Sequence, residues 1–132
     1  MKTKVFFLLP MFLMFLGCSS DNDTPEKENL KAVTYEVLLF EFTPDTGHNT
    51  SRLRYNIKYT NPNNVDIKGT SSLTMNYDGI IATPIKIVPP YIEIKANSSF
   101  IESYDKEEAF NLDFGKTNSI KLVSVAFNIA ED

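Results

Sequence analysis

The stretch that decides the fold of this chain is RLRYNIKY, residues 52–59, followed by TNPNN, residues 60–64. In residues 52–59, Arg, Asn and Lys alternate with apolar and aromatic residues. This period of two predicts a β-strand with one buried and one solvated face. The side chains predicted to be buried are Leu53, Tyr55, Ile57 and Tyr59. Asn side chains that bond to nearby backbone, together with the fixed φ of Pro62, predict a turn directly after this strand.

Downstream, a second alternating run starts at Val65 and passes Gly69 to reach Tyr77. Asp78-Gly79 then predicts a hairpin, because a type I′ turn needs positive φ at both central positions. The returning arm is residues 80–88, and Pro84 within it removes a ladder donor. We therefore expect residues 80–88 to form an edge strand or a bulged strand.

Upstream, residues 33–40 are apolar on both faces toward their end, which predicts a well-covered strand. A dense cluster of turn formers follows at residues 43–49. After Pro89-Pro90, a short strand leads to a turn at residues 96–99 and to the short run Phe100-Ile101. Residues 104–110 offer the one possible helical turn, which Asp105 would cap.

The end of the chain reads as a hairpin, in which residues 110–114 pair with residues 119–129 across a turn at residues 115–118. The returning strand is expected to place four apolar side chains on one face: Val123, Val125, Phe127 and Ile129. Six to eight short strands separated by turn clusters are typical of a β-sandwich. We predict an all-β domain over residues 31–132, a sandwich of about seven strands.

The strand that runs into Asn-Pro-Asn, the Asp-Gly hairpin and the long final hairpin resemble immunoglobulin-like and fibronectin type III-like modules. They resemble more loosely the late-embryogenesis-type domain, whose strand also runs into Asn-Pro-Asn. The resemblance covers Ala32 to Ile129 and rests on turn chemistry. It implies an immunoglobulin-like architecture and carries over no functional residues, since the tryptophan and disulfide of antibody domains are missing.

The beginning of the chain has the layout of an export signal. Lys2 and Lys4 are followed by residues 5–16, which are all apolar apart from the helix-breaking Pro10. This run is shorter than the about 20 apolar residues that a membrane-spanning helix needs, and it suits the core of a signal peptide.

Leu16-Gly17-Cys18 resembles the lipobox of bacterial lipoproteins, with Gly17 in its expected place. The resemblance implies cleavage between Gly17 and Cys18 and a lipid anchor on the Cys18 thiol. Residues 1–17 would then be the signal peptide and residues 18–30 a lipidated, disordered acidic tether. The alternatives are a secretory signal in which Cys18 is incidental, and a short N-terminal membrane anchor.

The tether begins with Ser-Ser-Asp-Asn-Asp at residues 19–23. Ser19 is not the Asp that marks inner-membrane retention, so the resemblance implies delivery to the cell outer membrane. The acidic run is also similar to the tag that carries Bacteroidota lipoproteins to the cell surface. The same residues would serve as a solvated linker, because they are too polar to bury apolar surface. The two interpretations are compatible.

Removal of residues 1–17 leaves 11 basic against 17 acidic residues, a net charge of −6. This balance argues against nucleic-acid partners, which require a basic patch to neutralise phosphates. It argues equally against a peripheral grip on anionic lipid headgroups. Membrane attachment is therefore expected through the lipid on Cys18.

Catalytic and metal motifs are missing from the sequence. His48 is the only histidine. It shares a loop with Asp45, Thr46, Thr50 and Ser51, which makes this loop a remote candidate for a hydrolase site. Carboxylate pairs for glycoside hydrolysis are not singled out by spacing. Two sets offer oxygen ligands for calcium without EF-hand spacing: Asp105, Glu107, Glu108 and Asp113, and Asn63, Asn64 and Asp66. We predict no enzyme activity, no metal and no cofactor.

A binding role remains. The sequence predicts an interaction or structural module whose partner is an envelope or extracellular protein, which would meet the edge strand near residues 80–88 or the loops. The alternative is a glycan or small ligand that packs on an exposed aromatic ring, for which Tyr77 and Tyr91 are the candidates.

Overall fold

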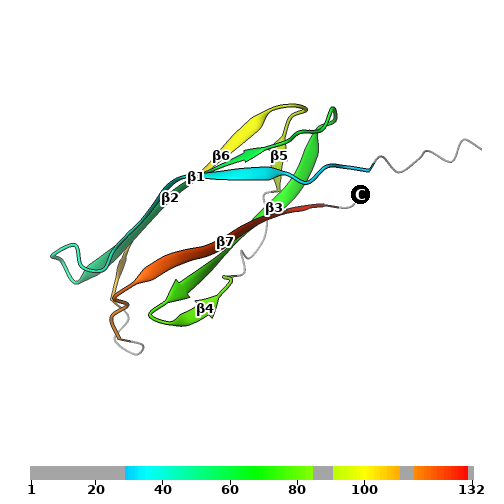
Figure 1. Cartoon of the computed structure of the whole chain (residues 1–132). Helices are drawn as coiled ribbons and strands as arrows, with labels where there is room; N and C mark the ends of the chain where they lie inside the picture. Colours follow the sequence, from blue (N-terminus) through cyan, green and yellow to red (C-terminus); the bar gives the residue numbers. More distant parts are fainter. Residues whose placement is uncertain (1–28, 85–90, 111–114, 131–132) are drawn as a thin grey trace, which may run out of the picture.

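The computed structural model describes residues 29–84, 91–110 and 115–130. Within these residues the chain forms seven strands and no helix. The strands are β1 (Thr34–Thr43), β2 (Thr50–Thr60), β3 (Ile67–Tyr77), β4 (Ile80–Ala82), β5 (Ile92–Ile94), β6 (Ser99–Ala109) and β7 (Ile120–Ile129). They form two antiparallel sheets that pack face to face as a β-sandwich (Figure 1). The prediction of an all-β sandwich is confirmed.

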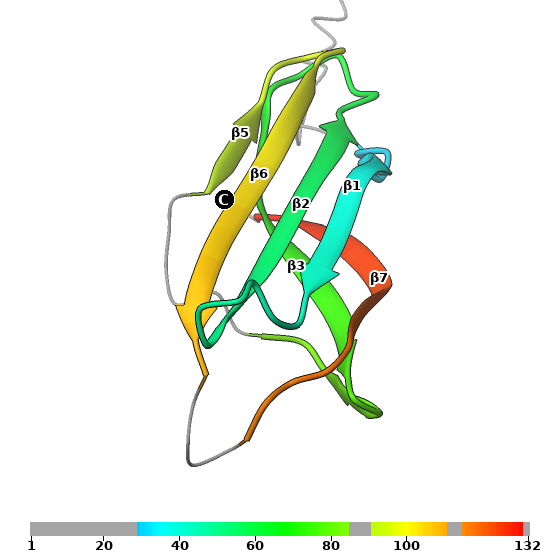
Figure 2. The same ribbon diagram turned by 90° about the vertical axis from the view of Figure 1, so that its left-hand side faces the viewer.

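The first sheet has the order β1-β2-β6, and Figure 2 shows these three strands side by side with β3 and β7 behind them. Its central strand is β2, the segment whose alternation is strictest. Tyr55, Ile57 and Tyr59 of β2 are buried, as predicted, and Leu53 is partly buried against the same core. The period of two thus identified the inner face correctly.

In the second sheet, β3 is central. β7 pairs along one side of β3, while β4 and β5 pair with opposite ends of its other side. Gly69 of β3 is buried, and a Cβ at this position would collide with the Phe127 ring and the Asn128 carbonyl oxygen of β7. Only glycine permits so close an approach of the two strands.

The core lies between the sheets and is rich in aromatic rings. Tyr55 stacks between Phe40 and Tyr104, with ring centroids 6.4 and 4.9 Å apart. Tyr59 meets Phe127 of the opposite sheet at 5.4 Å. These contacts join the two layers through dispersion and burial, without any disulfide among the described residues.

The Asp78-Gly79 hairpin is confirmed. Tyr77 pairs directly with Ile80, and the two turn residues have φ values of 50° and 101°. The returning strand, β4, lies at the sheet edge as expected, but it ends at Ala82, two residues before Pro84.

The prediction that residues 33–40 form a well-covered strand is wrong. β1 is the edge strand of its sheet, and Tyr35, Val37, Leu38 and Leu39 are exposed. Leu38 is the extra residue of a β-bulge, since Val37 pairs with Ile57 and Leu39 with Asn56. The side chains of this apolar run are exposed because β1 lies at the end of its sheet.

The short run at residues 100–101 and the helical turn at residues 104–110 are also wrong. Both belong to β6, which pairs along the whole length of β2. Its charged residues suit a strand that lies at a sheet edge, because charge there discourages pairing with other chains.

The predicted final hairpin is wrong in its partner. β7 pairs with β3, and residues 111–114 lie outside the described residues. Val125 is buried, and Phe127 and Ile129 pack on the core. Val123 is instead exposed, because a bulge between Leu122 and Ser124 turns it away and brings Leu122 inward.

Candidate functional site

Asn61 and Asn63 form a buried polar clasp at one end of the sandwich. The Asn61 Nδ2 group donates to the carbonyl oxygens of Val65 at 2.8 Å, Lys95 at 3.1 Å and Ile94 at 3.2 Å. Its Oδ1 accepts hydrogen bonds from the backbone and side-chain nitrogens of Asn63, both at 2.9 Å. The clasp therefore locks the β2–β3 turn against the strand end of β5.

The same clasp holds the chain where it enters the sandwich. The Lys31 backbone N–H donates to Asn63 Oδ1 at 2.7 Å, and Asn63 Nδ2 donates to the Lys31 carbonyl at 3.0 Å. The amide side chain thus replaces the backbone of a neighbouring strand. A third segment is thereby joined to the two loops.

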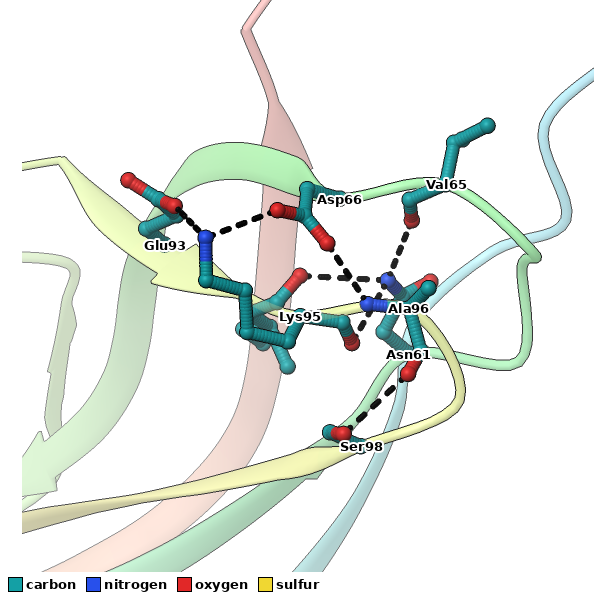
Figure 3. Close-up of polar contacts among 8 residues, drawn as sticks. Asn61, Val65, Asp66, Glu93, Lys95, Ala96 and Ser98 are labelled. Atoms are coloured by element: carbon teal, nitrogen blue, oxygen red, sulfur yellow. Dashed lines mark hydrogen bonds and ion pairs between the residues drawn. The ribbon is translucent and has the colours of Figure 1, made fainter.

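An exposed charged cluster, made of Asp66, Glu93 and Lys95, lies on the clasp (Figure 3). Lys95 Nζ donates to Asp66 at 2.7 Å and to Glu93 at 2.5 Å. The other Asp66 oxygen accepts from the Ala96 N–H at 2.9 Å. The hydrogen bond from Lys95 is the main cause that lowers the pKa of both carboxyl groups. The carboxylates thus neutralise the ammonium and brace the β5–β6 turn.

At the opposite end, the loop of the His48 hypothesis is held by its neighbours. Asp45 accepts hydrogen bonds from Lys116 at 2.8 Å and from the Gly47 N–H at 2.9 Å, and both contacts lower its pKa. The Thr46 and Thr50 hydroxyls both donate to Glu107. The two threonine hydroxyls that the His48 hypothesis offers as nucleophiles are therefore directed at a carboxylate of β6.

Glu102 takes part in an internal polar contact that was missed in the sequence. It accepts from Ser71 Oγ at 2.6 Å and from the Tyr59 hydroxyl at 3.2 Å, and so links the two sheets. Glu102 pairs with Ile57, whose side chain faces the core. The alternation of Glu102 with Phe100 and Tyr104 indicates that all three share the inner face. The helical turn expected at residues 104–110 interrupts this pattern.

The two tyrosines proposed for ligand binding do not share a site. Tyr77 is partly buried on the core, and its hydroxyl contacts the Met75 sulfur at 3.7 Å. Tyr91 is 57% exposed and precedes β5, which pairs with the opposite end of β3. Tyr91 alone retains an open aromatic face, and a ligand for it stays a prediction.

The other predicted sites are dispersed or lie outside the description. Gly17, Cys18 and Asp113 are outside the described residues. Asp105 is held by Arg52 in two hydrogen bonds of 2.7 Å, while Glu107 binds the threonines. Across residues 29–84, 91–110 and 115–130, no group of three or more His, Cys, Asp or Glu side chains is arranged to hold a metal. Nor does that part of the chain contain a helix long and apolar enough to cross a membrane.

The largest group of exposed apolar residues on one described strand is the β1 edge, which we define as Tyr35, Val37, Leu38 and Leu39. Tyr35 is 50% exposed and Leu38 is 47% exposed. Single exposed apolar residues are ordinary, but neighbouring ones on an edge strand indicate an interaction surface. The β1 edge is therefore a candidate binding surface, as is the β4 edge that the sequence predicts, where Ile80 is 72% and Ile81 63% exposed.

Comparison of the chain with known proteins found no matching family, no matching curated protein and no matching solved structure.

Proposed function

We propose that this chain is a cell-envelope lipoprotein, anchored in the outer membrane through Cys18, whose immunoglobulin-like sandwich acts as a non-catalytic binding or structural module. The observation that carries the proposal is the sequence from Lys2 to Cys18, with its basic start, short apolar core and Leu-Gly-Cys end. At about 0.8 kcal/mol per buried CH₂, two or three acyl chains hold a protein firmly on a membrane.

The contact between Lys31 and Asn63 supports this arrangement. It is a pair of hydrogen bonds that holds the chain at the predicted boundary between tether and sandwich. The sandwich therefore begins at a fixed point, directly after the predicted tether. The exposed β1 edge supplies a surface for a partner.

Cell fractionation tests the anchor. We expect the wild-type chain to partition with membranes and to incorporate labelled fatty acid, and the Cys18→Ser variant to be released in soluble form without the label. Ser19→Ala is the matched control, since it leaves the thiol in place and is expected to behave like the wild type. Equal membrane retention of the Cys18→Ser variant would contradict the proposal.

A further inference from the structure

Among the described sheet edges, β1 exposes the most large apolar side chains. β6 carries Asp105, Lys106, Glu107 and Glu108, while β4 and β5 are only three residues long. Charge and short length are the usual means of keeping a sheet edge from pairing with another chain. β7 has ten residues, but it exposes only one large apolar side chain, Val123. β1 has ten residues and only two charged ones, Glu36 and Glu41.

The bulge at Leu38 divides β1 into two arms of opposite parity. Before the bulge, the odd-numbered Tyr35 and Val37 share a face with the buried Tyr59 and Ile57. After it, the even-numbered Phe40 and Phe42 take that face, opposite Tyr55 and Leu53. Residues opposite each other in an antiparallel pair point to the same face of the sheet.

This change of parity sets which antiparallel registers join β1 to a second copy with inner face beside inner face. A two-fold axis at the bulge places the first arm of one copy against the second arm of the other. Residues on the inner face are odd-numbered in the first arm and even-numbered in the second, so each odd-numbered residue lies opposite an even-numbered one. One such register sets Glu36 opposite Glu41 and is disfavoured by like charge. The neighbouring register sets Tyr35 opposite Phe40, Thr34 opposite Glu41 and Glu36 opposite Leu39.

We propose that a second copy of this chain pairs antiparallel with β1 in the register that sets Tyr35 opposite Phe40 of the second copy. The three-stranded sheet of each copy then continues into that of the other. Aromatic cross-strand pairs form on the inner face, and Leu38 of each copy meets Val37 of the other at the axis. The contact is isologous and closes as a dimer.

The dimer also fits two membrane anchors, and this step rests on the proposed function. Antiparallel pairing in this register places the two Thr34 residues, where β1 begins, seven residues or about 24 Å apart at opposite ends of the paired strands. Each predicted tether of eleven residues, 19–29, reaches roughly 36–40 Å when extended. Both anchors therefore reach one bilayer when the dimer lies along it.

Sedimentation of the soluble mature chain tests the pairing independently of the anchor. Cys18→Ser removes the only cysteine and the lipid. We expect the mass of a dimer, and a monomer when Leu38→Lys is added, because two ammonium groups then lie on diagonal positions beside the axis and repel each other. Val123→Lys is the matched control: Val123 is an equally exposed bulge residue, at 51%, on the β7 edge. It should leave the dimer intact.

Cysteine pairs test the register in the same background. Thr34→Cys with Glu41→Cys is expected to give a disulfide-linked dimer on oxidation, whereas Glu36→Cys with Glu41→Cys is not. The reverse result would overturn the register. A monomeric mass up to about 200 µM protein, or loss of the dimer in Val123→Lys but not in Leu38→Lys, would overturn the proposal. Failure of the Cys18→Ser fractionation test would leave both results standing.

Discussion

Asn61 stabilises the fold through an amide that is fully buried and fully bonded. Its donor and acceptor atoms reach the two loops at one end of the sandwich, and its backbone N–H donates to the Ser98 carbonyl at 2.9 Å. Leaving a buried carbonyl without a hydrogen-bond donor costs more free energy than a formed hydrogen bond contributes to stability. The cost of removing this side chain therefore falls on the backbone groups of its partners.

We expect Asn61→Ala to lower the free energy of unfolding by roughly 2–4 kcal/mol, since several buried backbone groups lose their hydrogen bonds at once. Urea denaturation followed by circular dichroism measures the loss. Asn64→Ala removes a comparable amide from an exposed position and should change stability by well under about 1 kcal/mol. Equal losses in the two variants would show that the clasp is not a stabilising unit.

Among the elements, the β3–β4 hairpin depends on left-handed backbone at its turn. Gly79 has a φ of 101°, and its N–H donates to Asn76 Oδ1 at 2.6 Å. We expect Gly79→Ala to lower the free energy of unfolding by about 1–2 kcal/mol, because a Cβ is strained in this conformation. Nothing lies within 4 Å of the added Cβ, so the loss measures backbone strain alone.

Asp78→Asn is the control for this turn. Asparagine tolerates positive φ, and its Oδ1 is able to accept the Asn118 N–H that Asp78 accepts at 2.8 Å. Stability should therefore be retained. A loss in Asp78→Asn as large as that in Gly79→Ala would mean that the charge of Asp78, and not the turn geometry, holds the hairpin.

Also at the scale of elements, the sequence predicted strands better than it predicted their neighbours. β2, β3 and the Asp-Gly hairpin were predictable because alternation and turn chemistry are local. The positions of β1 at an edge and of β7 beside β3 were not, since the same alternation fits either side of any sheet. The bulges at Leu38 and Val123 left no signal in the sequence that distinguished them from regular strand.

At the scale of the whole molecule, the buried tyrosines make the fold sensitive to alkali. Burial is the largest cause that raises the pKa of Tyr55 and Tyr59 above the ordinary value of 10.0, and the charge of Glu102 adds to it. Both phenols stay protonated in the folded chain when those of the unfolded chain ionise. Unfolding then releases protons, so stability is complete below pH 10 and falls as the pH rises above it.

We expect the free energy of unfolding to be level near pH 8 and to fall above about pH 10, with each such tyrosine contributing up to about 1.4 kcal/mol per pH unit. Denaturation at a series of pH values measures the slope. Tyr59→Phe removes one ionising group and should make the slope shallower. An unchanged slope in this variant would contradict the assignment to Tyr59.

The candidate sites also differ in whether the residue type alone or contacts from distant residues decide them. Tyr91 was a candidate from its residue type, and the structure leaves its ring open. The His48 loop was a candidate from composition, yet its hydroxyls and Asp45 are engaged by Glu107 and Lys116 from distant strands and loops. The sequence predicts that β1 is covered. Its exposure depends on which strand lies at the edge of the sheet, and neighbouring residues do not specify this.

The sequence by itself determined the strands, the inner face of β2 and the sharp turns, because each of these follows from neighbouring residues. It also carries the Leu16-Gly17-Cys18 stretch on which the proposed anchor rests. Only the tertiary structure decided which strands are central, where the bulges fall and which apolar side chains stay exposed. These features depend on contacts between residues far apart in the chain. They place β1, which the sequence predicts to be well covered, at an exposed sheet edge, where we propose that a second copy pairs.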